Sequence, residues 1–327
     1  NYAGKCVNIL DTPGHQDFSE DTYRTLMAAD SAVMVIDAAK GIEAQTRKLF
    51  KVCAMRHIPI FTFINKLDRE ARDPFELLDE LEKEFGIGTY PVNWPIGWGV
   101  NFKGGFDRDK REILTFNEFH RGQDKLSAIE CDITDIERLD SLIGEYQRAE
   151  LVEQIELLDG ASFEFDIEKV RKGELTPVFF GSALTNFGIE PFLENFLKMT
   201  TAPLPRISEG EEISPFDENF SAFAFKIQAN MNKNHRDRIT FFRICSGKFE
   251  RGADYYHVQA DKTVRLSQPQ QMMAEERQII NEAYAGDIIG VFDPGIYSIG
   301  DTVCSLKKHV KYEGIPTFAP EHFAVIE

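Results

Sequence analysis

The chain has 327 residues, of which 43% are hydrophobic, and it carries a formal net charge of −17. This length and apolar content predict two or more globular domains and exclude a largely disordered chain. The sequence has no secretory signal and no run near the roughly 18 apolar residues of a membrane-spanning helix, and its acidity argues against broad nucleic-acid binding. We therefore expect a cytosolic, soluble protein. Five scattered cysteines lack metal-ligand spacing and are expected to be reduced core residues: Cys6, Cys53, Cys131, Cys245 and Cys304.

The first 205 residues alternate short apolar runs with helical patterns. The runs at residues 6–10, 32–36, 58–64 and 177–180 predict buried strands, each followed by polar or glycine residues. Such alternation is typical of an α/β fold with a parallel sheet, which binds ligands at the carboxyl edge of its strands. Because no loop, cap or initiator methionine precedes the first run, we expect the sequence to start inside a larger domain.

Local signals also predict helices in this half of the chain. Asp73 followed by Pro74 and Glu76 reads as an N-cap, a first-turn proline and a third-position acceptor, with leucines at helical spacing after them. Between about residues 95 and 172 the rhythm changes to a glycine-rich hairpin and an acidic, helix-prone stretch at 132–158. We interpret residues 95–172 as a subdomain inserted into the α/β domain.

The remaining third of the chain has a β pattern. Residues 201–205 and the acidic residues 208–212 indicate a linker. Alternating apolar residues and regularly spaced glycines then predict a small antiparallel barrel over residues 206–311. Residues 312–327 are expected to begin a third, incomplete domain, and residues 1–205 to form the first.

A cluster of turn and charged residues follows the first predicted strand: Asp11, Thr12, Pro13, Gly14 and His15. In a nucleotide-binding sheet, an aspartate at this point can hold Mg²⁺ through its water shell. The N–H of Gly14 can approach a γ-phosphate because no side chain obstructs it, and His15 would face the attacking water. The alternative is a plain strand-to-helix turn, for which Asp, Pro and Gly are common residues.

Asn65, Lys66, Leu67 and Asp68 close the strand predicted at residues 58–64. The Asp68 carboxylate can accept hydrogen bonds from the guanine N1–H and exocyclic amine, while Asn65 reaches the N7 and O6 edge and the Lys66 stem covers the ring. Adenine would present an acceptor to this carboxylate, so Asp68 is the expected base selector. The tetrapeptide alone is a weak signal, and its position after a strand strengthens it.

Gly181, Ser182 and Ala183 follow the strand predicted at residues 177–180. The backbone N–H of Ala183 could donate to guanine O6 and reinforce the same choice of base. Small residues after a strand are common, but three motifs in this order at successive strand ends are a stronger indication of a guanine-nucleotide site.

With these motifs, the sequence resembles the bacterial peptide chain release factor 3 family of translational GTPases. The resemblance also rests on residues 16–26 and 65–69, and on barrel residues 223–231, 235–238 and 245–248. It implies a P-loop-type GTPase domain, here truncated at its N-terminus, with an inserted subdomain and a β-barrel second domain. It further implies GTP or GDP and Mg²⁺ as ligands, with Asp11 holding the metal through water and His15 orienting the attacking water.

The sequence departs from the family pattern at one point. No G-x-x-x-x-G-K-[ST] occurs in it, and no candidate exists for the switch-one threonine. The family places both before the Asp11 motif, so truncation is the simplest explanation. We therefore expect a GTPase in the intact parent protein and weak nucleotide binding without turnover in this chain.

The resemblance implies a cytoplasmic termination factor that acts on the ribosome and promotes the departure of class I release factors. The alternatives are an elongation factor G-like or ribosome-protection GTPase, and a non-hydrolysing scaffold that docks on the ribosome. Four basic residues among the barrel strands are candidates for contacting ribosomal RNA or, equally, for solvated surface positions: Arg236, Arg238, Arg243 and Lys248. No membrane or DNA partner is expected.

Overall fold

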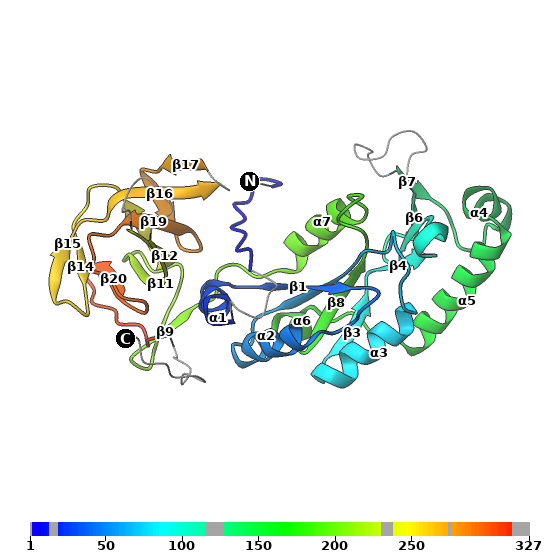
Figure 1. Ribbon diagram of the computed structural model, residues 1–327, viewed down its shortest axis with the longest axis horizontal. Helices are drawn as coiled ribbons and strands as arrows, with labels where there is room; N and C mark the ends of the chain where they lie inside the picture. The colour runs from blue at the N-terminus through cyan, green and yellow to red at the C-terminus, as the bar shows by residue number, and fades with distance from the viewer. Residues whose placement is uncertain (1, 13–18, 116–126, 230–237, 274–275, 316–327) are drawn as a thin grey trace, which may run out of the picture. The chain divides into compact units, whose positions relative to one another are not determined.

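The computed structural model describes residues 2–12, 19–115, 127–229, 238–273 and 276–315 (Figure 1). The chain separates into two compact units, Asn1–Asp30 with Ala202–Glu327 and Ser31–Thr201. Each unit has its own hydrophobic core. No helix in the described ranges has the length and apolar character needed to cross a membrane.

The unit Ser31–Thr201 is built on a four-stranded parallel sheet. Its order is β1-β2-β8-β3, with bounds Ala32–Asp37, Ile60–Asn65, Leu175–Phe180 and Gly88–Pro91. β2 and β8 are buried along nearly their whole length, as expected for central strands of a sheet covered on both faces. The three strands predicted between residues 32 and 180 are therefore confirmed.

Helices cover both faces of this sheet: α2 (Ala44–Met55), α3 (Pro74–Phe85), α6 (Ile167–Arg171) and α7 (Ile189–Met199). Leucines of α3 pack with Ile64 and Phe180 on one face, while Phe192 and Met199 of α7 pack with Phe61 on the other. The predicted start of α3 is confirmed, because the Asp73 side chain accepts from the backbone N–H of Phe75 and Glu76, at 2.8 and 3.3 Å.

Residues 93–161, which overlap the insertion predicted at residues 95–172, form an antiparallel sheet in the order β4-β5-β6-β7 and two helices after it. The bounds are Asn93–Ile96, Gly104–Asp107, Glu112–Thr115 and Ser127–Glu130 for the strands, Gly99–Asn101 for the short helix η2, and Ile136–Ile143 and Glu145–Ala161 for α4 and α5. Trp94 and Phe106 of this sheet are fully buried in the same core as α3 and β8. The insertion is thus packed on the parallel sheet.

The other unit contains helix α1 (Ser19–Ala28) and an antiparallel sheet of eight strands, ordered β15-β14-β20-β11-β12-β19-β16-β17. The strands are Ser221–Ala229 (β11), Arg238–Ser246 (β12), Tyr255–His257 (β14), Lys262–Val264 (β15), Ser267–Met273 (β16), Glu276–Ile279 (β17), Ile288–Phe292 (β19) and Thr302–Ser305 (β20). Two antiparallel strand pairs accompany them, the hairpin of β9 (Arg206–Ser208) with β10 (Glu211–Ile213) and the pair of β13 (Lys248–Glu250) with β18 (Glu282–Tyr284). This sheet confirms the predicted antiparallel barrel domain.

Two arginines, Arg243 and Arg206, hold the end of α1 within this unit. The guanidinium of Arg243 donates to the carbonyl oxygen of Ala28 at 2.9 Å and to the carboxylate of Asp30, while Arg206 donates to the carbonyl oxygen of Met27 at 2.6 Å. The last carbonyls of a helix lack intrahelical partners and carry the negative end of its dipole, so cations stabilise them. This explains why residues 19–30 group with the barrel strands.

The structure contradicts three expectations about strands, loops and cysteines. Residues 6–10 form no strand, and Ile9 is 82% exposed, because an apolar run becomes a strand only where a neighbour accepts its backbone hydrogen bonds. Residues 208–212 are a hairpin rather than a linker, since Glu209 and Gly210 adopt the left-handed conformations of a tight turn. Cys6 is exposed, whereas the other four cysteines are buried as predicted.

Candidate functional site

The second and third predicted motifs meet at the carboxyl edge of the parallel sheet. β2 and β8 are neighbours, with Ile64 opposite Phe180, so the residues that follow the two strands lie side by side. The Gly181 N–H donates to the carbonyl oxygen of Ile64 at 2.9 Å, and the Leu67 N–H donates to the carbonyl oxygen of Gly181 at 3.2 Å. The two loops are therefore joined by backbone hydrogen bonds.

Asn65 links both loops through its side chain. Its Oδ1 accepts the N–H of Lys66 and the N–H of Ala183, each at 2.8 Å. Lys66 has φ +74°, a left-handed conformation that a non-glycine residue rarely adopts and that this bond helps to hold. Because Oδ1 is engaged twice, the amide Nδ2 of Asn65 is the group left to donate to a ligand such as a purine.

Asp68 is oriented by the third motif. The hydroxyl of Ser182, which is fully buried, donates to Oδ1 of Asp68 at 2.5 Å. The Asp68 side chain is 18% exposed, and Arg69 Nε lies 3.8 Å from its Oδ2. A charge-assisted bond to one oxygen fixes the carboxylate plane while the remaining lone pairs can still accept. This arrangement suits recognition of two adjacent N–H groups on a base.

Position 181 has no room for a side chain larger than that of glycine. A Cβ at this position would lie 2.4 Å from the carbonyl oxygen of Phe187 and 2.7 Å from the ring of Phe63. Both distances are shorter than van der Waals contact, and one involves backbone. The small residue that the sequence showed here therefore permits the close crossing of the loop over β2.

Two contributors to this edge carried no signal in the sequence. Asn93, at the start of β4, donates Nδ2 to the carbonyl oxygen of Phe180 at 2.9 Å and accepts the Phe180 N–H at 2.8 Å. It therefore fixes the end of β8 immediately before Gly181. Asp37, the last residue of β1, pairs with the ammonium of Lys66, with 2.7 Å between Nζ and Oδ2.

Asp37 remains ionised at this edge. Burial raises the pKa of Asp37, but hydrogen bonds from Lys66 and from the Ala39 N–H outweigh that effect, and its pKa lies below the usual value. At the edge formed by β1, β2 and β8, the Asp37 carboxylate is thus neutralised by the Lys66 ammonium. The Asp68 carboxylate accepts from a hydroxyl group and has a guanidinium at 3.8 Å.

The first motif belongs to the other unit. Asp11 is exposed and Thr12 half-buried, in a stretch without regular secondary structure, and both are in Asn1–Asp30. Pro13, Gly14 and His15 lie outside the described residues. The catalytic role of His15 and the metal role of Asp11 stay predictions.

The described side chains are compatible with an Mg²⁺ ion whose ligands are mainly phosphate oxygens and water. The described residues contain no group of three or more His, Cys, Asp or Glu side chains that could hold a metal ion. Mg²⁺ in nucleotide sites needs only one or two protein carboxylates, because it keeps several waters and binds the phosphates. A single exposed carboxylate such as Asp11 meets that requirement.

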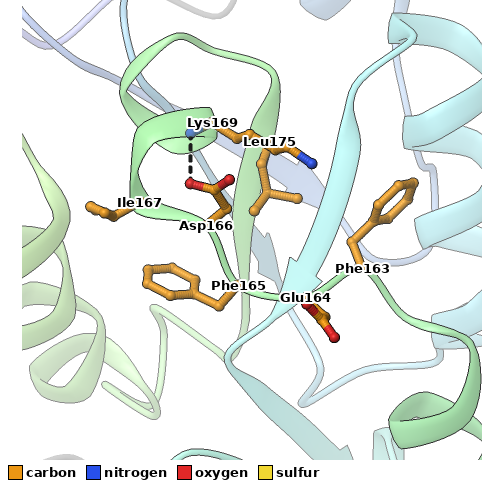
Figure 2. Close-up of a pocket in the computed structure, with 7 residues that line it drawn as sticks. All are labelled: Phe163, Glu164, Phe165, Asp166, Ile167, Lys169 and Leu175. Carbon is orange, nitrogen blue, oxygen red and sulfur yellow. Dashed lines mark hydrogen bonds between the residues drawn. The ribbon is translucent and has the colours of Figure 1, made fainter.

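A separate hollow lies at the opposite end of β8 (Figure 2). Phe163, Phe165 and Leu175 line it, and Asp166 turns back to accept the Lys169 N–H as the cap of α6, at 3.3 Å. Leu175 begins β8 whereas Gly181 follows its end, so this hollow is not part of the motif edge.

Comparison with known proteins identifies the fold family. Residues 1–202 match the family described as the Elongation factor Tu GTP binding domain, and residues 219–306 match Elongation factor G domain 2. The chain belongs to the elongation factor Tu GTP-binding domain family. The motif edge of β2 and β8 is thus part of a GTP-binding-domain fold, and the eight-stranded antiparallel sheet lies in the residues that match Elongation factor G domain 2.

Relatives with this GTP-binding domain are named peptide chain release factor 3. The protein of Symbiobacterium thermophilum is 60% identical over 323 residues, covering 99% of this chain and 61% of that protein. That of Gloeobacter violaceus is 56% identical, covering 98% of this chain and 60% of that protein. The chain therefore spans about 60% of the length of these relatives.

A solved structure shares the fold of this GTP-binding family member. The crystal structure of ttk003000868 from Thermus thermophilus matches with a TM-score of 0.68 at 23% identity. The match covers 91% of this chain and 44% of that one. At this identity the likeness concerns the fold alone.

The barrel residues proposed to meet RNA differ in their surroundings. Arg243 is only 2% exposed and is bonded within its unit, so neither alternative considered for it, a contact with RNA phosphates or a solvated surface position, fits the structure. Arg238 is half-exposed and lies 2.8 Å from Asp293, Lys248 pairs with two glutamates, and Arg236 lies outside the described residues. Paired surface charges of this kind give no support to an RNA contact.

Proposed function

We propose that this chain is the guanine-nucleotide-binding and barrel portion of a cytoplasmic GTPase that acts on the ribosome in translation termination and promotes release of class I release factors. The observation that carries the nucleotide part is the joined edge of β2 and β8, where Asn65, Asp68 and Ser182 are held by specific hydrogen bonds. The termination role is supported by relatives at 51–60% identity that are named peptide chain release factor 3.

The arrangement of the edge supports the proposal that it would prefer guanine. Asp68 would accept from the base N1–H and exocyclic amine, and the Asn65 Nδ2 would donate to N7 or O6. The Ala183 N–H already donates to Asn65, so its expected contact with O6 would be a shared bond. Adenine offers an acceptor and no amine at the Asp68 carboxylate, and a polar site rejects such an analogue strongly.

Hydrolysis would depend on the first motif. Asp11 would hold Mg²⁺ through water, the Gly14 N–H would approach the γ-phosphate, and His15 would orient the attacking water. The metal would neutralise charge that develops on the phosphate oxygens. Positioning and electrostatic stabilisation, rather than covalent chemistry by the protein, would lower the barrier once the ribosome triggers the reaction.

Calorimetric titration of this chain with GDP, with ADP as the matched control, tests the proposal. The sequence has no G-x-x-x-x-G-K-[ST] cradle for the phosphates, so we expect weak GDP binding, a clear preference over ADP and no GTP turnover. Equal affinities for GDP and ADP would refute the base assignment. Micromolar or tighter GDP binding would refute the claim that this chain binds weakly.

The match of residues 219–306 to Elongation factor G domain 2 favours one alternative, an elongation factor G-like or ribosome-protection GTPase. The two candidates differ in what the ribosome does in response. A termination factor accelerates dissociation of a labelled class I release factor from post-termination ribosomes, whereas a translocase moves transfer RNA. A dissociation assay with the whole protein that contains this chain separates them.

A further inference from the structure

Hydrogen bonds hold both the backbone and the ammonium group of Lys66. Its N–H is bonded to Asn65 Oδ1 at 2.8 Å, and its carbonyl oxygen accepts the Arg69 N–H at 3.1 Å. Its ammonium lies 2.7 Å from Oδ2 of Asp37, the residue opposite Asn65 in the β1–β2 register. The four-carbon stem therefore runs from the end of β2 to the end of β1 along the motif edge.

The carboxylate that holds Lys66 is itself immobilised. Oδ1 of Asp37 accepts the Ala39 N–H at 2.9 Å, and the Asp37 backbone carbonyl accepts the N–H groups of Lys40 and Gly41 at 3.1 and 2.8 Å. The Asp37 side chain is 15% exposed and the Lys66 side chain 47% exposed. One flank of the stem thus remains open while the ammonium is held.

We infer that Asp37 is a positioning residue for base binding: its carboxylate anchors the Lys66 ammonium and so fixes the Lys66 stem as a flat apolar support for the purine ring. This inference rests on the proposed guanine-nucleotide function. A free lysine loses most of its rotamer freedom when a ring stacks on its stem, and anchoring before binding removes part of that loss.

The neighbouring pair Lys40–Glu43 shows what an ordinary surface ion pair looks like here. Its atoms are 3.3 Å apart, and the two side chains are 63% and 55% exposed. Pairs of that kind contribute little to structure or binding. Glu43→Gln is therefore a matched control for Asp37→Asn, because it also removes one carboxylate that pairs with a lysine near the same strand end.

The variant Asp37→Asn keeps an oxygen for the Ala39 N–H and replaces the other oxygen with an amide that cannot hold an ammonium. We expect its affinity for GDP to fall about three- to tenfold, which corresponds to the loss of an anchored stem. Affinity for IDP, which lacks the exocyclic amine, should fall by the same factor, because stacking does not distinguish the two bases. The ratio of GDP to IDP affinity, which reports Asp68, should stay constant.

Ligand-observed NMR titrations of the 327-residue chain with GDP and with IDP measure both quantities, and acetylation by an N-hydroxysuccinimide ester, read by mass spectrometry, reports the freedom of each lysine. Asp37→Asn should raise acetylation of Lys66 relative to Lys40, whereas Glu43→Gln should raise only that of Lys40. Unchanged Lys66 acetylation, or GDP affinity equal to that of the unsubstituted chain, would overturn the inference.

Two further outcomes separate this inference from the proposed function. A fall in the ratio of GDP to IDP affinity in Asp37→Asn would mean that the edge itself has collapsed, and it would overturn a positioning role for Asp37. Absence of GDP binding by the unsubstituted chain would overturn the proposed function together with the inference, whereas GDP binding that is indifferent to Asp37→Asn counts against Asp37 alone.

Discussion

Asn93 offers the sharpest test of how β4 supports the motif edge. Its side chain makes two buried hydrogen bonds with the backbone of Phe180, one to the carbonyl oxygen at 2.9 Å and one from the N–H at 2.8 Å. Asn93→Leu preserves the number and branching of the side-chain heavy atoms but leaves both backbone groups without partners. Asn93 is 6% exposed and Phe180 1% exposed, so water cannot readily replace the lost bonds.

The expected cost follows from those two orphaned groups. Leaving one buried donor or acceptor unsatisfied costs about 1–3 kcal/mol, so the pair should cost about 2–6 kcal/mol of the free energy of unfolding. Added burial of the leucine side chain offsets part of this, and we expect a net loss of about 3 kcal/mol. Because Gly181 follows Phe180, GDP binding should weaken as well.

Urea unfolding followed by tryptophan fluorescence measures this loss. The only two tryptophans of the chain, Trp94 and Trp98, lie in the unit Ser31–Thr201, so the signal reports that unit. Asn195→Leu is the control, since Asn195 is 9% exposed but its Nδ2 bonds only to the carbonyl of Pro191, which a helical N–H also satisfies. A cost for Asn93→Leu below about 1 kcal/mol, or equal to that of the control, would refute the reasoning.

Three further predictions concern separate parts of the chain. Asp68→Asn turns one oxygen into a donor, so the ratio of GDP to XDP affinity should fall on the order of 100-fold in NMR titrations, because xanthine has a carbonyl where guanine has an amine; an unchanged ratio would exclude Asp68 from the base site. The Lys308 ammonium, 2.6 Å from Asp217, lowers the pKa of Asp217 to about 2. The stabilisation from that pair is fully present above the unfolded pKa of about 3.9 and is lost as the pH falls through about 2. Lys308→Met should therefore weaken the dependence of the melting temperature of the barrel on pH between about pH 4 and pH 2, as measured by circular dichroism. Arg243→Met leaves the Asp30 carboxylate and the end of α1 without their buried cation, so the free energy of unfolding should fall by about 3–5 kcal/mol in chemical denaturation. Adding Asp30→Asn to the same chain should recover part of this loss. A double variant less stable than Arg243→Met alone would contradict this assignment.

Much of the parallel sheet follows from local sequence. The apolar runs at residues 58–64 and 177–180 predict β2 and β8, and the polar residues after them predict where a ligand site lies. Asp73 predicts the start of α3 because a cap acts on backbone N–H groups only two and three residues away. Signals that act over two or three residues can be read from one short stretch of sequence.

The same local signals fail where a partner is needed. Residues 6–10 have the composition of a strand, but in the structure Asn8 donates instead to Asp287 of the barrel, at 3.1 Å. Residues 208–212 have the composition of a linker, yet they pair as a hairpin, because the left-handed φ of Glu209 and Gly210 reverses the chain. Strand formation depends on a neighbour as much as on composition.

The sequence by itself determined the α/β architecture and the order of the three motifs, and it predicted the residues that we propose to select guanine. Tertiary structure alone decided that Asp37 would hold Lys66 from 29 residues away, that Asn93 would fix the end of β8 from 87 residues away, and that α1 would be held by barrel arginines. Periodicity and caps act within a few residues and leave a pattern in the sequence. A single polar side chain that meets its partner only after the chain has folded leaves none.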